Sequence, residues 1–459
     1  MKRLTIILLT LLVTLSVSAQ GQKKKAGHND EAESLFDYAK EVISSNARFN
    51  FAVLCNPEVS LDDTANCLLS RAISEIKKMK DIAVVVVIGN ITKNGLPEEI
   101  AYAHNLMKKS ELEYLALPGN RDLSYRENGG TDFKRIFGDD SFRSNINGVM
   151  FLGINTSMIT DTATSHLLPQ NELWLKSQLK SMGKKAPILA FTSNGLTDQG
   201  IDNWHEITNQ LRKYNTQLCI NAMDNSFGRR EYDQVCGYSM ETVKTSYLVG
   251  YVRGAELFIN RKELGGSLKP ADTIAIEAKM YLEPKNKKEG KQKDESLVWQ
   301  YKNPYAIYTG ATVGKDYCYF GDDHGMFYCI DLKKGKVRWK YQTVLRIVTK
   351  PVVVDDRVLF GGCDRNLYCL NAITGEFIWK VRTEQPVTRQ PIIEGENVYI
   401  DKNDSVQYTI DLKTGEEGRP RPSSSRCPHD NGERITAIDD NDYITTTIDG
   451  VVTRHTRTR

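Results

Sequence analysis

The 459-residue chain lacks several features that would point directly to a function. It has no excess of charge, because 61 basic residues meet 58 acidic ones for a net charge of +3, and this balance gives no argument for nucleic-acid binding. Its seven histidines form neither an H-x-H nor an H-E-x-x-H pair, so these zinc signatures are missing from the sequence. After the N-terminus no apolar run is long enough to span a bilayer. The length suits two or three globular domains.

The N-terminus carries a targeting signal. Lys2 and Arg3 provide a basic start, residues 4–17 are apolar, and small residues precede Gln20. This pattern predicts a signal peptide, residues 1–19, that is cleaved after Ala19. No cysteine follows the apolar core, so a lipoprotein anchor is not indicated. We therefore expect an exported protein, secreted or periplasmic, without a membrane span after cleavage.

The nine cysteines do not have the spacing of a dense disulfide framework. Cys55, Cys219, Cys329 and Cys369 each lie inside an apolar, strand-like run, where a free thiol behaves as a small buried hydrophobe. The odd count leaves at least one thiol unpaired unless chains are cross-linked. The sequence does not define the disulfide connectivity.

Five short apolar runs in the first half of the chain end in polar residues. Each is typical of a β-strand that delivers side chains at its carboxyl end, which is where open α/β sheets build their sites. The five segments are residues 51–58, 83–90, 115–122, 188–195 and 218–225. Residues 66–80, 96–109 and 170–182 are predicted to be helices between such strands, and residues 246–266 and 273–282 to be further strands that close the domain.

The order and spacing of these five segments resemble the calcineurin-like metallophosphoesterases over roughly residues 48–245. The resemblance implies an αββα sandwich and a pair of metal ions at the strand ends. The corresponding positions, however, hold almost none of the family's ligands. The family's Asp, His, Asp, Asn and three further His positions fall on Asn56, Glu58, Asn90, Asn120, Ser193, Met223 and Asn225, and its catalytic His falls on Arg121.

This residue set is poorly suited to two divalent ions. Two such ions close together need bridging carboxylates, whereas neutral amides bind zinc, manganese or iron weakly and a thioether prefers Cu(I). Arginine grips anions but does not shuttle protons, so Arg121 cannot replace a histidine acid. Two roles for Arg121 are equally open: it binds an anion, or it forms a salt bridge with Asp122 or Glu58.

The second half of the chain contains a 40-residue repeat. Each unit has a tryptophan, an Asp or Asn and a glycine in the same register. These residues are Trp299, Trp339 and Trp379; Asp331, Asn371 and Asp411; and Gly335, Gly375 and Gly415, with Cys329 and Cys369 also in register. Four short strands per unit are typical of a β-propeller blade, and the motif looks like the quinoprotein, PQQ-like repeat. The tryptophans are expected to pack between blades, and no bound quinone is expected.

The fold class is therefore α/β plus all-β, an αββα sandwich followed by a partial β-propeller. We predict the segments 1–19 (signal peptide), 20–47 (linker and short helix), 48–283 (phosphoesterase-like domain), 284–296 (linker) and 297–459 (repeats). The last unit, residues 433–459, ends before its tryptophan strand, which predicts three blades and a partial fourth. Either the chain is shorter than a longer relative, or the propeller closes with the β-rich segment before residue 298.

Two functions of different classes remain. The first is a catalytically inactive pseudo-phosphoesterase that binds or scaffolds a protein, a glycan or an anionic ligand, with no cofactor and no nucleic acid. The alternative is a metal-dependent phosphohydrolase, acting on phosphomonoesters or phosphodiesters, with a weak mononuclear site. That site would hold a hard divalent cation between Glu58, Asn120 and Asp122 or Asp224.

Overall fold

The computed structural model describes residues 48–123, 130–159, 164–222, 226–276, 294, 296–423, 426–428 and 434–457. The predicted signal peptide, the short helix before residue 48 and most of the predicted linker lie outside these residues. Among the described residues, no helix combines the length and the apolar character that a membrane crossing requires.

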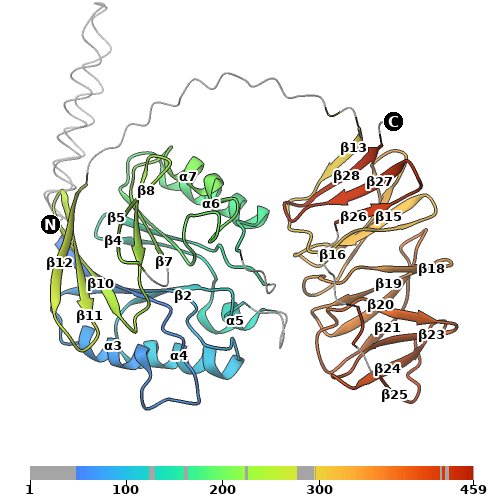
Figure 1. The fold of residues 1–459 in the computed structure, drawn as a ribbon, viewed down its shortest axis with the longest axis horizontal. Helices are drawn as coiled ribbons and strands as arrows, with labels where there is room; N and C mark the ends of the chain where they lie inside the picture. Colours follow the sequence, from blue (N-terminus) through green and yellow to red (C-terminus); the bar gives the residue numbers. More distant parts are fainter. Residues whose placement is uncertain are drawn as a thin grey trace, which may run out of the picture. The chain divides into compact units, whose positions relative to one another are not determined.

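The first part of the chain contains a six-stranded sheet with the order β12-β11-β10-β1-β2-β3 (Figure 1). Strands β1, β2 and β3 are parallel, and β10 to β12 add antiparallel strands at one edge. The bounds are β1 (Arg48–Cys55), β2 (Ile82–Gly89), β3 (Tyr114–Pro118), β10 (Ser246–Arg253), β11 (Glu256–Glu263) and β12 (Leu268–Ala275). The three parallel strands bring their carboxyl ends to one edge, so the polar residues that follow them are neighbours.

A second six-stranded sheet has the order β4-β5-β6-β7-β9-β8. Its central strands β5, β6, β7 and β9 are parallel, and its two edge strands are antiparallel to their neighbours. The bounds are β4 (Phe142–Ile146), β5 (Val149–Ile154), β6 (Ile188–Thr192), β7 (Thr216–Ala222), β8 (Gly228–Tyr232) and β9 (Val235–Met240).

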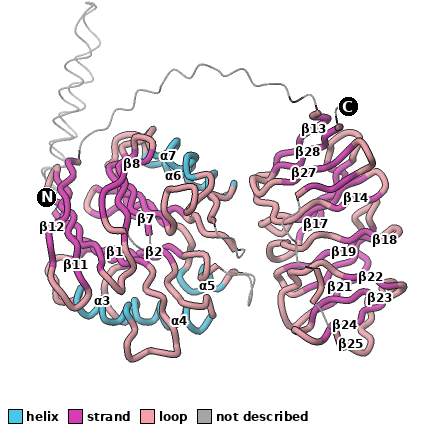
Figure 2. Tube along the Cα trace, in the orientation of Figure 1, coloured by secondary structure: helices cyan, strands magenta, loops and turns pink. Residues whose placement is uncertain are grey.

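The two sheets face each other, and helices cover their outer faces (Figure 2). Phe51, Phe151 and Phe191 are fully buried between the sheets, and their rings contact one another. Apolar faces of α3 and α4 pack on the first sheet, and those of α6 and α7 on the second. The helices are α3 (Leu68–Ile76), α4 (Pro97–Lys109), α5 (Asp132–Phe137), α6 (Pro169–Met182) and α7 (Trp204–Leu211). The predicted helices at 66–80, 96–109 and 170–182 are thus confirmed as α3, α4 and α6.

The repeat region forms four sheets of four strands. We call them blades one to four, in the chain order of β14, β18, β22 and β26, the strands with which they begin. Blade one contains β14 (Thr312–Gly314), β15 (Tyr317–Gly321), β16 (Met326–Asp331) and β17 (Val337–Gln342); blade two contains β18 (Val352–Val354), β19 (Arg357–Gly362), β20 (Asn366–Asn371) and β21 (Phe377–Arg382). Blade three contains β22 (Ile392–Glu394), β23 (Asn397–Asp401), β24 (Val406–Asp411) and β25 (Arg421–Pro422); blade four contains β26 (Ile435–Ala437), β27 (Asp442–Thr446), β28 (Val451–Thr456) and β13 (Leu297–Lys302).

Blade four corrects the expectation of a partial last blade. Strand β13 pairs antiparallel with β28, with Trp299 opposite Arg454. The strand that begins the repeat region therefore completes the blade that ends it. The β-rich segment before residue 298 is not used, because β10, β11 and β12 belong to the first sheet of the α/β region.

The tryptophans join neighbouring blades through glycines. The indole Nε1 of Trp339 donates to the carbonyl oxygen of Ala372 at 3.1 Å, and a Cβ on Gly375 would lie 2.6 Å from the Trp339 ring. Trp299 and Trp379 repeat this contact on the turns that contain Gly335 and Gly415. All three glycines have positive φ, so this position needs a residue without a side chain for two separate reasons.

The blades form an open series in the described part of the chain. Hydrophobic clusters join blade four to one, one to two, and two to three, but none joins three to four. Where blade two has Leu367 and Cys369, blade three has Gln407 and Thr409, and Arg419 stands in the register of the tryptophans. The side of blade three that faces away from blade two therefore carries polar residues at these positions, and Gln407 is buried there beside Cys427.

Candidate functional site

The ends of β1 and β2 are linked by asparagine side chains. The Oδ1 of Asn56 accepts a hydrogen bond from the backbone N–H of Asn90 at 2.8 Å, and the Oδ1 of Asn90 accepts one from the N–H of Arg121 at 3.2 Å. A Cβ on Gly89 would lie 2.0 Å from the Asn56 Oδ1. These two amide oxygens are directed at backbone donors of the adjacent loop, where they hold the strand ends together.

Glu58 and Arg121 form an ion pair across the same edge. The distance from Arg121 Nη1 to Glu58 Oε1 is 2.7 Å, and the two side chains are 48% and 46% exposed. Of the two partners considered for Arg121, the structure therefore pairs it with Glu58. Because both groups are half exposed, solvent screens the pair and it adds little to folding stability.

Asp122 is buried and faces the opposite way, into the loop between β2 and α4. Its carboxylate accepts hydrogen bonds from the backbone N–H groups of Ile91, Thr92 and Gly119 and from the Thr92 hydroxyl, at 2.6–2.9 Å. Burial raises the pKa of Asp122 to about 6, although these four hydrogen bonds act in the opposite direction. Asp122 anchors two loops at the base of the site.

The remaining family positions also have internal partners. The Oδ1 of Asn120 accepts hydrogen bonds from the N–H of Met158 at 3.1 Å and from the hydroxyl of Ser165 at 3.0 Å. The Ser193 hydroxyl donates to the carbonyl oxygen of Pro118 at 2.5 Å, beside the Ser157 hydroxyl, which donates to the same oxygen. Both residues thus fasten the loop after β3.

The residues Met223, Asp224 and Asn225, which complete the sequence-based set, lie outside the described residues. Within the part of the chain that the structure describes, no three His, Cys, Asp or Glu side chains come close enough together to hold a metal ion. Of the two described carboxyl groups at the strand ends, Asp122 is buried among hydrogen-bond donors, and Glu58 faces the guanidinium of Arg121.

A second polar centre was not found from the sequence. His166 is buried, with Nδ1 2.6 Å from Asp202 and Nε2 3.0 Å from Asp449 in blade four. The two carboxylates raise its pKa against the effect of burial, which lowers it. Gln170 also bridges the α/β and repeat regions, because its Nε2 donates to Asp323 at 2.9 Å. No sequence motif marks such contacts, since the partners are far apart in the chain.

Comparison with known proteins identifies only the repeat type. Residues 348–418 match the family described as outer membrane protein assembly factor BamB. The repeat region of this chain is thus BamB-like over these residues, which are a minor part of the whole. No curated protein matches the chain.

Solved structures give distant likenesses. A europium-containing methanol dehydrogenase aligns with 16% identity and a TM-score of 0.25 over 28% of this chain and only 27% of its own. BamB from Moraxella catarrhalis aligns with 15% identity and a TM-score of 0.22 over 50% of this chain and 83% of its own. The computationally designed Ika4 protein aligns with 17% identity and a TM-score of 0.27 over 36% of this chain and 99% of its own. Likeness at this level carries no argument about activity.

Proposed function

We propose that this chain is an exported, catalytically inactive relative of the metal-dependent phosphoesterases that acts by binding or scaffolding. The αββα layer order and the five strand-end segments support the phosphoesterase kinship. The propeller-like repeats support a binding role, because such sheets present broad loop surfaces rather than a reactive group. Export follows from the N-terminal signal pattern.

One observation carries the proposal: the described residues at the ligand positions already have protein partners. Asn56 and Asn90 accept backbone N–H groups, Asn120 accepts from Met158 and Ser165, and Glu58 binds Arg121. A metal ion at this edge would have to displace these bonds and would gain mainly neutral oxygens in exchange. Neutral amide oxygens are weak ligands for the transition metals that activate water.

No described residue at the strand ends replaces the proton donor that a phosphoesterase needs. Protonation of a leaving alkoxide needs a group that gives up a proton near neutral pH. An arginine side chain is too weak an acid to supply that proton, and the buried Asp122 is enclosed by backbone donors rather than open to a substrate. The site is suited to holding charge and not to transferring protons.

The test is metal content together with activity. The full mature chain is incubated with Mn, Zn, Fe, Ni, Mg and Ca, desalted and measured by mass spectrometry, and then assayed with p-nitrophenyl phosphate and bis-p-nitrophenyl phosphate. We expect no retained transition metal and no turnover above a protein-free blank. Near two transition ions per chain, or turnover, contradicts the proposal, and turnover that needs Mg or Ca alone would favour the weak mononuclear phosphohydrolase instead.

A revertant supplies the positive control. It carries Asn56→Asp, Glu58→His, Asn90→Asp, Arg121→His, Ser193→His, Met223→His and Asn225→His. We expect it to take up metal and to hydrolyse the diester. An unaltered chain that matches the revertant in either measurement would show that the ligand substitutions do not abolish the chemistry.

A further inference from the structure

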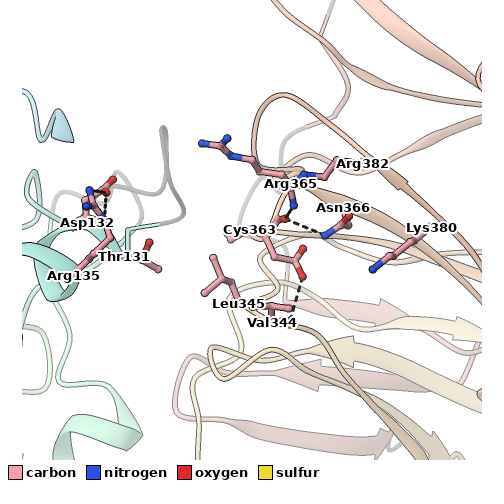
Figure 3. A pocket seen from close by; sticks show the side chains of 11 residues that line it. Thr131, Asp132, Arg135, Val344, Leu345, Cys363, Arg365, Asn366, Lys380 and Arg382 are labelled. Atoms are coloured by element: carbon pink, nitrogen blue, oxygen red, sulfur yellow. Dashed lines mark hydrogen bonds and ion pairs between the residues drawn. The ribbon is translucent and has the colours of Figure 1, made fainter. Parts of the chain in front are cut away.

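A cavity of about 720 Å³ lies at one edge of blade two (Figure 3). One side of the cavity is formed by the α/β region at the start of α5, with Thr131, Asp132 and Arg135. The other side is formed by the repeat region: Val344 and Leu345 after β17, Cys363, Asp364 and Arg365 in the turn between β19 and β20, Asn366 at the start of β20, and Lys380 and Arg382 on the outer strand β21. We call this second side the blade wall. The size matches cavities that hold a whole small molecule rather than a bare ion.

Positive charge dominates this wall. The Nη1 of Arg382 donates to the backbone carbonyl oxygen of Asp364 at 2.7 Å, and this neutral acceptor leaves the charge of the guanidinium uncompensated. Among the described residues the side chain of Lys380 has no hydrogen-bond or ion-pair partner, while its backbone belongs to the β20–β21 ladder. The only carboxylate on the blade wall is Asp364, which accepts from the Tyr368 hydroxyl at 2.6 Å and from the Val344 N–H at 3.2 Å.

The repeat shows that the scaffold does not need these cations. At the positions 40 residues away, blade one has Gly325 for Arg365 and Gln342 for Arg382. Blade three has Ser405 and Pro422 at the same positions. The blade forms with a neutral residue at both positions, so the two arginines of blade two are an addition to the common fold.

One of the two arginines, Arg365, has an unfavourable backbone conformation. Arg365 has φ +63°, in the left-handed region that L-residues with a Cβ avoid, and the matching Gly325 has φ +80°. Glycine would fit this turn more easily. A strained residue that the fold does not require is a sign of a function at that place.

We propose that the blade-two cavity binds a small molecule through a phosphate or sulfate group. Guanidinium groups match the oxygens of tetrahedral oxyanions in a bidentate manner, and Lys380 adds a point charge beside them. The space beyond the anion takes the rest of the molecule. The inference does not depend on the loss of metal chemistry proposed above, because no residue that lines this cavity is one of the strand-end positions discussed there.

Calorimetric titration of the full mature chain tests the ligand class. The probes are inorganic phosphate, glucose 6-phosphate, glucose 6-sulfate and, as the uncharged control, glucose. We expect heat of binding with phosphate and with both glucose esters, tighter for the esters than for phosphate, and none with glucose. The ratio of the two ester affinities identifies which oxyanion is preferred. The proposal is overturned if neither ester binds, or if glucose binds as tightly as the esters.

Three variants locate the site. Arg382→Gln and Arg365→Gly install the blade-one residues, and each is expected to weaken ester binding at least about tenfold. Lys340→Gln removes one positive charge at the blade-one position that matches Lys380, and it is expected to leave ester binding unchanged. Ester binding that survives both arginine substitutions, or that falls as far in Lys340→Gln, overturns the assignment to this cavity.

Thermal unfolding separates a binding role from a structural one. If Arg365 serves a ligand, Arg365→Gly relieves the backbone strain and the melting temperature stays equal or rises while binding falls. If Arg365 instead stabilises the turn, the same substitution lowers the melting temperature, and the argument from strain fails. Lys380→Gln adds a variant without any backbone change, and it is expected to weaken ester binding with an unchanged melting temperature.

Discussion

In the α/β region each polar position at a strand end has no equivalent elsewhere in the chain. In the repeat region, by contrast, each position of blades one to three has an equivalent 40 residues away in a neighbouring blade. From the sequence, Asn56, Asn90 and Asn120 could either bind a metal ion or stabilise loops. Their hydrogen bonds to backbone N–H groups in the structure show that they stabilise loops. In the blades, a residue shared by all units is scaffold and a departure from the repeat needs its own explanation. Repetition thus separates structural from special residues in a way that a single copy does not.

The departures fall into two groups. Gln407 and Thr409 replace the apolar residues by which inner blades pack, on the side of blade three that faces away from blade two. Arg365 and Arg382 replace neutral residues beside a cavity. The first group places polar side chains where blade two has apolar ones, and the second provides charge at positions where the other blades have neutral residues. The following predictions test these distinctions in order of expected size.

The largest effect is expected at the inter-blade tryptophan. Trp339→Ala removes an indole that packs on blade two and donates to the Ala372 carbonyl, and we expect a loss of about 4 kcal/mol in unfolding free energy. Chemical denaturation measures it. Gly375→Ala should also destabilise strongly, whereas Gly395→Ala, with positive φ but no atom within 4 Å of the new Cβ, reports the backbone cost alone. Equal effects of the two glycine changes would contradict the packing role.

The buried carboxylate of Asp122 should give a pH-dependent stability. Its folded pKa, about 6, lies above the ordinary value of 3.8, so the folded state holds the proton more tightly. The resulting stabilisation is complete below pH 3.8 and is lost as the pH rises through 6, a change of about 3 kcal/mol. Urea unfolding at pH 4 and pH 7 measures it.

Asp122→Asn is the control for this pH dependence, since an amide does not titrate. The difference in unfolding free energy between the two proteins should change across this pH range and stay constant above it. A difference that is independent of pH from 4 to 7 would mean that the carboxylate is ionised throughout, held by its four hydrogen bonds.

A smaller effect is expected at the polar face of blade three. Gln407 is 1% exposed; its Nε2 donates to Asp401 and its Oε1 accepts from Arg421. Gln407→Leu restores the inner-blade residue but leaves these partners unsatisfied, at a cost of about 2 kcal/mol. Thr409→Val is the matched change, because the Thr409 Oγ1 is buried without a hydrogen-bond partner, and it should cost nothing. Stabilisation by Gln407→Leu would show that the hydrogen bonds of Gln407 do not contribute to the stability of blade three.

The smallest effect is expected at the site itself. Glu58→Ala breaks the exposed ion pair with Arg121, and we expect a change below about 0.5 kcal/mol that fades with added salt. Denaturation at low and high salt measures it. A loss of more than about 2 kcal/mol would mean that the pair is a structural element of the edge rather than a surface contact.

The sequence determined the local elements of this protein. The alternation of strands and helices along the chain predicted α3, α4 and α6, and the 40-residue period located the tryptophan and glycine that connect the blades. These features depend on neighbours along the chain, through side-chain periodicity and through turns that need glycine. A local pattern is sufficient to specify them.

The tertiary structure alone decided which distant residues meet. Strand β13 completes blade four by pairing with β28, and this pairing corrects the partial blade that a linear count of repeats predicts. It also decided that Arg121 pairs with Glu58 and that Asp122 turns inward, although the two residues are adjacent in the chain. The physical reason is that backbone hydrogen bonds and buried charges are satisfied by whichever groups the fold brings together, and a local pattern along the chain does not show which distant groups these are.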